Sequence, residues 1–265
     1  MNAYSSPGGS LEAWAAVPAA FRAGATLATP WGDVFGPLQA GLTDGLVVVG
    51  QLGQSLDGRI ATNSGHSKYI NCEAGLDHLH RLRALMDAVV IGVGTALADD
   101  PQLTVRRVSG PNPARVILDP HGRLRANARV LTDDGTRRLV VTTPAATWAV
   151  AEGNEVVRLP ADNGHIAPAA VLAALAERGL RRILIEGGAR TVSGFMSAGC
   201  LDRLHMMVAP IILGTGRAGL TLAPIERVDH ALRPPTRSYP LGDDVLFDCD
   251  LSATRVPIGR AKIST

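Results

Sequence analysis

The sequence has few cysteines, few aromatic side chains, little net charge and no long apolar run. Its three cysteines, Cys72, Cys200 and Cys249, lie far apart and form no CxxC or His/Cys pattern, so neither a zinc site nor a disulfide framework is indicated. A net charge of +2 and an aromatic content of 4% argue against a nucleic-acid surface. No apolar run reaches the roughly 18 residues of a membrane helix, and Glu12 and Pro18 interrupt any N-terminal signal sequence. We therefore expect a protein of the reducing cytoplasm with no nucleic-acid or membrane partner.

The most informative stretch is Leu180 to Met196, LRRILIEGGARTVSGFM. A β-branched apolar run predicts a buried strand, which ends at Glu186. Gly187 and Gly188 then allow a sharp turn and a close backbone approach. The helix predicted from Ala189 would present unpaired N–H groups, so this turn is either a phosphate cradle or an ordinary strand-to-helix connection. A carboxylate at Glu186 would repel a bound anion unless it faced another part of the ligand.

Short apolar strands alternate with helical patterns along the chain, which predicts an α/β fold with a mainly parallel sheet and an antiparallel edge. We expect an N-terminal extension over residues 1–45 and one domain over 46–265. In the extension, Leu11–Ala23 predicts a short helix that buries Trp14, Val17 and Phe21, whereas the Gly- and Pro-rich stretch Pro30–Asp44 predicts irregular structure. The expected main helix is Glu73–Met86. The expected strands are Leu46–Gly50, Ala88–Val93, Arg115–Leu118, Leu139–Thr142, Val156–Leu159, Ile183–Ile185, Leu204–Pro210 and Val245–Leu251.

Polar and glycine-rich loops follow several of these strands and should line one cleft at the carboxyl edge of the sheet. The sequence offers no GxSxG motif, no paired Cys and His, and no metal-ligand spacing. Gly92-Val93-Gly94 is not a dinucleotide fingerprint, because Leu97 stands where Gly or Ala is required. Anion cradles without a protein nucleophile favour a cofactor that brings its own chemistry, of which hydride transfer from a nicotinamide is the simplest case.

At this point the residues show a family resemblance. SLDGRIAT (55–62), SGHSKYI (64–70), LRALMDAVVIGVGTALADDPQLTVR (82–106), RVILD (115–119), ILIEGGART (183–191) and APIILGTG (209–216) occur in order. Together they resemble the reductase domain of the bacterial riboflavin-biosynthesis deaminase-reductase family. The resemblance implies a three-layer dihydrofolate-reductase-like fold, NADPH as hydride donor, and reduction of the ribose C1′ of a ribosylaminopyrimidine 5′-phosphate to a ribityl group. It also implies a homodimer.

The resemblance also assigns residues. It implies that the substrate is bound by Gln51, Ser67, Arg83, Leu103, Arg106 and Glu186, with Arg83 and Arg106 on the phosphate. The implied cofactor positions are Gly53, Tyr69, Gly94, Thr95 and Asp99, together with Gly187, Gly188, Ala189, Arg190, Thr191 and Val192. Our candidate for the NADPH 2′-phosphate is Arg123, with His121 or Arg125 as alternatives. The catalytic proton donor stays open among Glu186, Asp57 and water.

Two departures from the family keep alternatives open. No zinc-deaminase signature is present, so we expect no deaminase activity. Many bacterial members carry Lys where this chain has Gln51, and an amide can hydrogen-bond but cannot supply a proton at neutral pH. The alternatives are a reductase of another heterocycle, such as a dihydropterin or dihydrofolate, and a non-catalytic nucleotide sensor.

Overall fold

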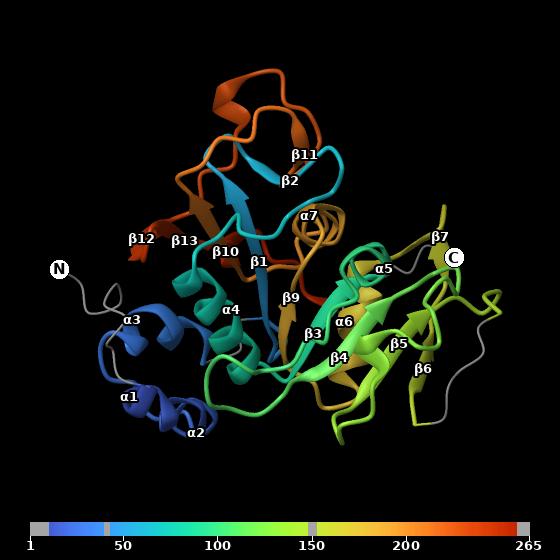
Figure 1. The fold of residues 1–265 in the computed structure, drawn as a ribbon. Coiled ribbons are helices and arrows are strands. Elements are labelled where there is room, and N and C mark those ends of the chain that lie inside the picture. Colours follow the sequence, from blue (N-terminus) through green and yellow to red (C-terminus); the bar gives the residue numbers. More distant parts are fainter. Residues whose placement is uncertain (1–10, 40–42, 148–152, 259–265) are drawn as a thin grey trace.

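The computed structural model describes residues 11–39, 43–147 and 153–258. Its centre is a nine-stranded sheet (Figure 1) whose strands from β10 to β6 are parallel, whereas β13 and β12 add an antiparallel edge. This arrangement confirms the predicted α/β sheet. In spatial order the strands are β12 (Thr236–Leu241), β13 (Asp244–Asp250), β10 (Arg203–Ala209), β1 (Val47–Ser55), β9 (Arg182–Ile185), β3 (Ala88–Gly92), β4 (Ala114–Leu118), β5 (Arg138–Thr142) and β6 (Glu155–Arg158).

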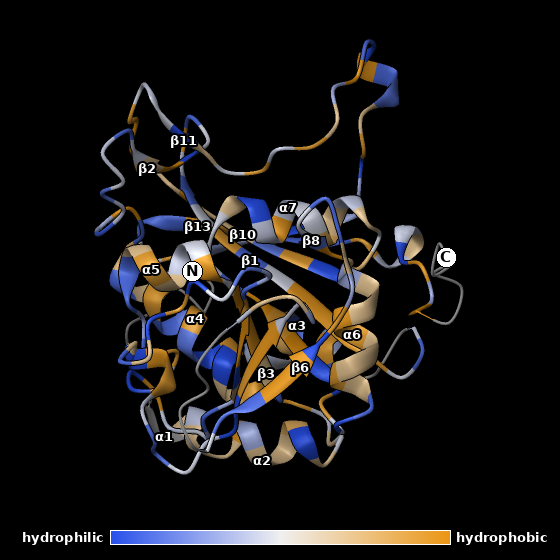
Figure 2. Cartoon of the chain, turned by 90° about the vertical axis from the view of Figure 1, so that its right-hand side faces the viewer, coloured by the Kyte–Doolittle hydropathy of each residue, from blue (hydrophilic) through white to orange (hydrophobic). Residues whose placement is uncertain are grey.

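Helices cover both faces of the sheet and make three layers. On one face lie α4 (Glu73–Leu85) and α5 (Val93–Asp99), and on the other lie α6 (Pro168–Ala176) and α7 (Ala189–Ser197). The central strands are apolar on both sides because each face buries its own hydrophobic cluster. Figure 2 shows this apolar interior between α4 and α6. Within the described ranges, no helix combines the length and apolar character needed to cross a bilayer.

The segment before β1 forms a helical layer against α4, made of α1 (Leu11–Ala15), α2 (Val17–Arg22), α3 (Trp31–Phe35) and a 3₁₀ turn at Gly36–Leu38. The helical prediction for 11–23 is confirmed, with Trp14, Val17 and Phe21 buried. The irregular structure predicted from Pro30 is wrong for 31–38. There Trp31, Val34, Phe35 and Leu38, spaced i, i+3, i+4 and i+7, bury one helical face.

Two short ribbons lie outside the main sheet. One pairs β2 (Arg59–Thr62) with β11 (Gly216–Ala218), and the other pairs β7 (Ala161–Asp162) with β8 (His165–Ile166). The β2–β11 ribbon lies beyond the carboxyl end of β1 (Figure 1). Polar loops therefore gather at the edge of the sheet where the cleft was expected.

A chain of buried polar groups joins α4 to the antiparallel edge. His78 Nε2 lies 3.0 Å from His205 Nδ1, and His205 Nε2 lies 3.3 Å from Asp248 Oδ1. Arg203 donates to both oxygens of Asp248, at 2.8 and 2.7 Å. Burial acts to raise the pKa of Asp248, but its contacts with His205 and Arg203 outweigh burial and lower it to about 2. His205 is thus a core histidine held between His78 and Asp248.

We predict that Asp248→Asn lowers the free energy of unfolding by about 3 kcal/mol, because it leaves the buried Arg203 guanidinium without its main counter-charge. The matched control is Asp250→Asn, since Asp250 contacts the same guanidinium at 3.2 Å but is one-third exposed; it should cost less than about 1 kcal/mol. Urea unfolding at neutral pH measures both. Because the pKa of Asp248 in the folded protein lies below its ordinary value of 3.8, the wild-type advantage is complete above that value and is lost as the pH falls through about 2. Equal losses in the two variants would contradict this assignment.

Candidate functional site

The site is built at the carboxyl ends of β9, β3 and β1. Ile185 ends β9, and the next residue, Glu186, is only 7% exposed. Its side chain lies on the α4 face of the sheet, because Leu184, two residues earlier, packs in the cluster beneath α4. Gly187, at a φ of +78°, then turns the chain into α7. Glu186 and the start of α7 are therefore adjacent but face different spaces.

Glu186 forms a buried, two-pronged ion pair with Arg83 of α4. Arg83 Nε donates to Glu186 Oε2 at 2.9 Å, and Arg83 Nη2 donates to Oε1. Arg83 Nη1 donates to the backbone oxygen of Thr104 at 3.1 Å. The pairing balances the charge of Glu186, so this carboxylate does not stand unpaired beside the glycine turn. It also leaves both Glu186 oxygens as acceptors, which does not fit the predicted role of proton donor.

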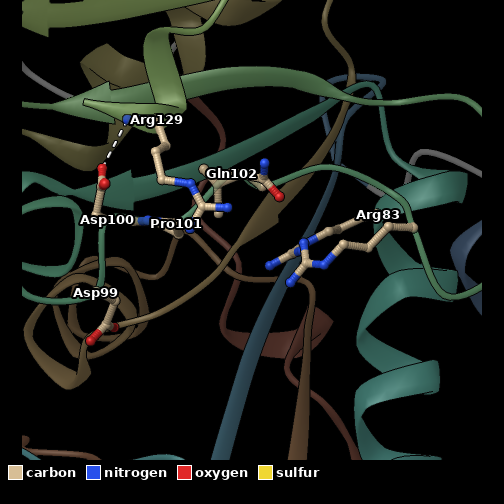
Figure 3. A pocket seen from close by; sticks show the side chains of 8 residues that line it. Arg83, Asp99, Asp100, Pro101, Gln102 and Arg129 are labelled. Carbon is tan, nitrogen blue, oxygen red and sulfur yellow. Dashed lines mark hydrogen bonds between the residues drawn. The ribbon is translucent and has the colours of Figure 1, made fainter. Parts of the chain in front are cut away.

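A cavity of about 240 Å³ opens beside this pair and carries three arginines. Arg83 comes from α4, Arg106 from the loop before β4, and Arg129 from the 3₁₀ turn Arg129–Leu131. Figure 3 shows Arg83 and Arg129 directed toward the same space. Burial and the neighbouring Arg83 and Arg129 lower the pKa of Arg106, which still leaves it charged at neutral pH. The remaining lining residues are Asp99, Asp100, Pro101, Gln102 and Leu103. Three guanidinium groups in one cavity have the charge and the donors to bind an anion with several oxygens, such as a phosphate.

The loop between α5 and β4 (residues 100–113), which we call the arginine loop, shapes one wall of this cavity. Asp100 and Leu103 both have positive φ, at 39° and 57°, which is uncommon outside glycine and concentrates at functional sites. Asp100 Oδ1 accepts the backbone N–H of Arg129 at 2.8 Å (Figure 3), which places Arg129 at the rim. Leu103 lines the cavity while its side chain is buried in the α4-side core.

His80 holds the arginine loop at Arg106. Its Nδ1 accepts the Arg106 backbone N–H at 3.1 Å, which requires an unprotonated Nδ1. Burial and the charges of Arg83, Arg106 and Arg107 lower the pKa of His80 to about 3. The imidazole is therefore neutral, and remains an acceptor, throughout the physiological pH range.

The glycine turn after β9 meets the start of α5 in a closely packed cradle. Gly188 N–H donates to Thr95 Oγ1 at 2.9 Å. A Cβ at Gly188 would lie 2.8 Å from that oxygen, and a Cβ at Gly92 would lie 2.6 Å from Thr191 Oγ1. The first N–H groups of α7, at Ala189 and Arg190, have no partner inside the helix. The predicted residues Gly94, Thr95, Gly187, Gly188, Ala189, Arg190 and Thr191 are thus brought together, in a form that fits the phosphate groups of a dinucleotide.

Asp57 does not have the geometry of a catalytic acid. Hydrogen bonds from the Ser55 hydroxyl and from the backbone N–H groups of Leu213 and Gly214 lower its pKa to about 2. An acid with that pKa is ionised at neutral pH and has no proton to donate. The prediction of Asp57 as a catalytic candidate is corrected accordingly: Asp57 ties the turn after β1 to the loop after β10.

Two further positions predicted to contact the cofactor, Gly53 and Val192, are closely packed. A Cβ at Gly53 would lie 1.9 Å from Asn71 Oδ1, so the space beside Gly53 is filled by this chain's own Asn71. Val192 is fully buried in the core cluster on the α7 face, and its N–H points to Gly188 O at 3.4 Å. Gly53 therefore lies against Asn71, Val192 lies in the core, and the contacts of both with a cofactor stay a prediction.

The remaining predicted residues lie at varying distances from the arginine cavity. Gln51, 4% exposed, sits on β1 in register with His205. Ser67 and Tyr69 lie in the exposed loop between β2 and α4. Asp99 lines the cavity with the arginines rather than the glycine cradle. Arg123 is exposed in the loop after β4 and does not line the cavity.

Sequence reasoning missed Arg129 and His80. Arg129 reaches the cavity through its bond to Asp100, a residue 29 positions away, and no local pattern marks such a contact. His80 had one usable signal, its position three residues before Arg83 on the predicted helix.

The comparisons with known proteins agree with this geometry. Residues 47–246 match the RibD C-terminal domain family. The 2,5-diamino-6-ribosylamino-4(3H)-pyrimidinone 5′-phosphate reductase of Methanothermobacter thermautotrophicus is 36% identical over 202 residues, covering 73% of this chain and 93% of the relative. The riboflavin biosynthesis protein RibD of Bacillus amyloliquefaciens is 38% identical over 176 residues, but the match covers 64% of this chain and 46% of that protein. The chain thus spans about half the length of such RibD relatives.

Solved structures support the same relationship. The deaminase/5-amino-6-(5-phosphoribosylamino)uracil reductase of Thermotoga maritima superposes with a TM-score of 0.67 at 28% identity, covering 77% of this chain and 56% of that chain. The yeast riboflavin biosynthesis reductase Rib7, at 18% identity and a TM-score of 0.65 over 79% of this chain and 90% of its own, shows the shared fold. The expected three-layer dihydrofolate-reductase-like fold is confirmed. The chain belongs to the RibD C-terminal domain family.

Proposed function

We propose that this protein is an NADPH-dependent reductase that converts the ribosyl group of a ribosylaminopyrimidine 5′-phosphate to a ribityl group in riboflavin biosynthesis. The observation that carries the proposal is the three-arginine cavity beside Glu186, next to the glycine cradle. The cavity supplies a phosphate site and the cradle supplies a dinucleotide site. Relatives named as reductases of this substrate class support the proposal.

The three cavity arginines have different proposed roles in substrate binding. Arg83 donates to Glu186 and Thr104 through most of its N–H groups, and Glu186 balances its charge. Arg106 and Arg129 are therefore the principal phosphate ligands. Glu186, held rigid by Arg83, is positioned to accept from sugar or amine groups of the substrate. A site that fixes both ends of the sugar orients C1′ for reaction.

The glycine cradle would hold the NADPH pyrophosphate against the N-terminus of α7. When bound, this cofactor supplies the hydride that adds to C1′ of the ring-opened sugar. Glu186 and Asp57 are acceptors in this structure, which leaves water, the third candidate, as the proposed proton source. Gln51 replaces the family Lys as a hydrogen-bonding group that carries no transferable proton at neutral pH.

We also propose a homodimer in the cytoplasm. The segment after β11 (residues 219–235) leaves the body of the protein (Figure 2) and exposes Leu222, Ile225, Val228 and Leu232. Exposed apolar side chains on a projecting segment are typical of a protein–protein contact, and a second copy is the partner that the family resemblance implies. Analytical ultracentrifugation should give twice the monomer mass. The three cysteines are free, which is compatible with a reducing compartment.

The experiment that tests the function is NADPH oxidation, followed by the absorbance of the reduced nicotinamide. It compares 2,5-diamino-6-ribosylamino-4(3H)-pyrimidinone 5′-phosphate, 5-amino-6-ribosylaminouracil 5′-phosphate and dihydrofolate. Turnover with either pyrimidine supports the proposal and identifies the substrate. Turnover with dihydrofolate alone, or with none of the three, contradicts it.

We predict that Arg106→Gln raises the KM for the pyrimidine phosphate by about tenfold or more, because it removes a charge-assisted hydrogen bond to phosphate. Arg181→Gln is the matched control, since Arg181 is exposed just before β9 at the opposite edge of the sheet. Steady-state kinetics measure the KM of both variants for the pyrimidine phosphate. An unchanged KM in Arg106→Gln would show that the phosphate binds elsewhere.

We predict that Glu186→Gln lowers kcat by at least about tenfold while NADPH affinity changes less than about twofold. The variant removes the counter-charge of Arg83 and an acceptor for the substrate, whereas the cradle is formed by backbone groups. Glu177→Gln, at the exposed end of α6, is the control. A loss of NADPH affinity in parallel with kcat would contradict this division between the two spaces.

We predict that Arg123→Ala weakens NADPH binding by about tenfold and leaves NADH binding unchanged, because only NADPH carries the 2′-phosphate that Arg123 would contact. Nicotinamide fluorescence titrations with both cofactors measure the two affinities. If NADPH binds to the variant as tightly as to the wild type, another residue binds the 2′-phosphate.

A further inference from the structure

The helical layer at the N-terminus (residues 11–38) lies outside the family match at 47–246, yet it packs against α4 and the arginine loop, which carry two of the three cavity arginines. We propose that this layer is a positioning element of the arginine cavity, and that the indole of Trp14 is its decisive contact. The inference rests on the proposed role of the cavity as the substrate phosphate site. It assigns the segment a function in substrate affinity rather than in chemistry.

The arginine loop is fastened to α4 at its cavity end. Thr104 O accepts from Arg83, the Arg106 N–H donates to His80, and the Arg107 side chain contacts Asp77 at 2.6 Å. These bonds fix the backbone at 104–107. Between Arg107 and β4 the loop runs on through Ser109 and Gly110, where it contacts both the N-terminal layer and α4.

Trp14 holds this second end of the loop. Its Nε1 donates to Ser109 O at 2.7 Å, across 95 residues of sequence, and its side chain is 1% exposed. Gly110 is pressed against α4, since a Cβ there would lie 2.5 Å from Ala84 Cβ and 3.6 Å from Pro18 of α2, and its φ of +148° favours glycine. The loop is therefore clamped between α2 and α4 at one specific point.

The same layer holds α4 on both sides of Arg83. The Arg81 guanidinium lies 4.8 Å from the Trp31 ring centre and 5.6 Å from that of Trp14. Arg22 donates to Ala84 O at 3.3 Å and to Asp87 at 3.2 Å, just past the end of α4. The layer thus contacts residues two before and one after Arg83 as well as the loop that carries Arg106.

The consequence is a fixed distance between Arg106, a proposed phosphate ligand, and the Arg83–Glu186 pair that forms the neighbouring part of the cavity. Arg83 and Arg106 lie on different elements, so their spacing depends on how the loop sits on α4. A displacement of about one ångström is enough to weaken a positioned ligand contact severely. Loss of the Trp14 bond frees the loop near Ser109, whereas the hydrogen bond of the glycine cradle joins Gly188 to Thr95 and involves no residue of the layer.

The test is Trp14→Phe, which keeps an aromatic ring in the core but removes the N–H. The matched control is Ser109→Ala, which retains the accepting carbonyl. Ribose 5-phosphate binding by calorimetry and NADPH binding by fluorescence are measured on the full chain, together with the KM and kcat of the pyrimidine reduction. We expect Trp14→Phe to weaken ribose 5-phosphate binding and raise the KM by about five- to tenfold, with kcat and NADPH affinity within about twofold of wild type. Ser109→Ala should match the wild type.

Gly110→Ala is the second variant, because it disturbs the same end of the loop from the α4 side. It should weaken ribose 5-phosphate binding in the same selective way, with faster amide hydrogen exchange over 103–110 in both variants. Wild-type binding of ribose 5-phosphate by Trp14→Phe would overturn the positioning role and leave the proposed function intact. Parallel losses of sugar phosphate and NADPH in both variants would reveal a general effect on folding and also overturn it. If the wild type itself does not bind ribose 5-phosphate, the cavity is not the phosphate site and both proposals fail.

Discussion

The site depends on the buried ion pair between Arg83 and Glu186. A guanidinium taken out of water is costly unless its donors are matched, and Glu186 matches two of them with both carboxylate oxygens. The pair also reduces the repulsion expected between Glu186 and an anion bound at the glycine turn. A free carboxylate directly before Gly187 and Gly188 would repel a phosphate bound at the glycine turn, whereas a carboxylate paired with Arg83 presents little net charge to that side.

Glu186 balances the charge of Arg83. The charges of the other two cavity arginines remain available to a bound anion. Arg106 and Arg129 have no side-chain carboxylate partner among the described residues. Asp100, on the same rim, uses an oxygen to accept the Arg129 backbone N–H and so acts as a support for that arginine. Two proposed anion sites therefore lie near the end of β9. One is made of side-chain guanidinium groups and the other of backbone N–H groups, and the neutral Arg83–Glu186 pair lies between them.

The sequence pattern predicted those elements of the fold that depend mainly on neighbouring residues in the chain. Apolar β-branched runs located the strands, and Gly-Gly after β9 marked the turn, because backbone freedom is encoded in the residue itself. The family resemblance supplied Arg83, Arg106 and Glu186. Contacts between distant segments were not predictable: the Cys72 N–H at the start of α4 is satisfied by Asp244, 172 residues away, and Arg129 depends on Asp100. Asp57 was misjudged for the same reason, since two of its three donors, the N–H groups of Leu213 and Gly214, come from the distant loop after β10.

The backbone strain at Asp100 and Leu103 links the site to the helical layer that precedes β1. Asp100 and Leu103 occupy the left-handed region without the advantage of glycine, at a cost of the order of 1 kcal/mol each. Such conformations persist only where packing over-determines them. Leu103 is 2% exposed and belongs to the same apolar cluster as Trp14, Phe21, Trp31 and Phe35, so the burial that offsets its backbone strain is shared with the N-terminal helices. The stability of that cluster and the shape of the arginine cavity thus depend on each other. The helices before β1 contribute to the shape of the site through this packing, although none of their described side chains lines the cavity.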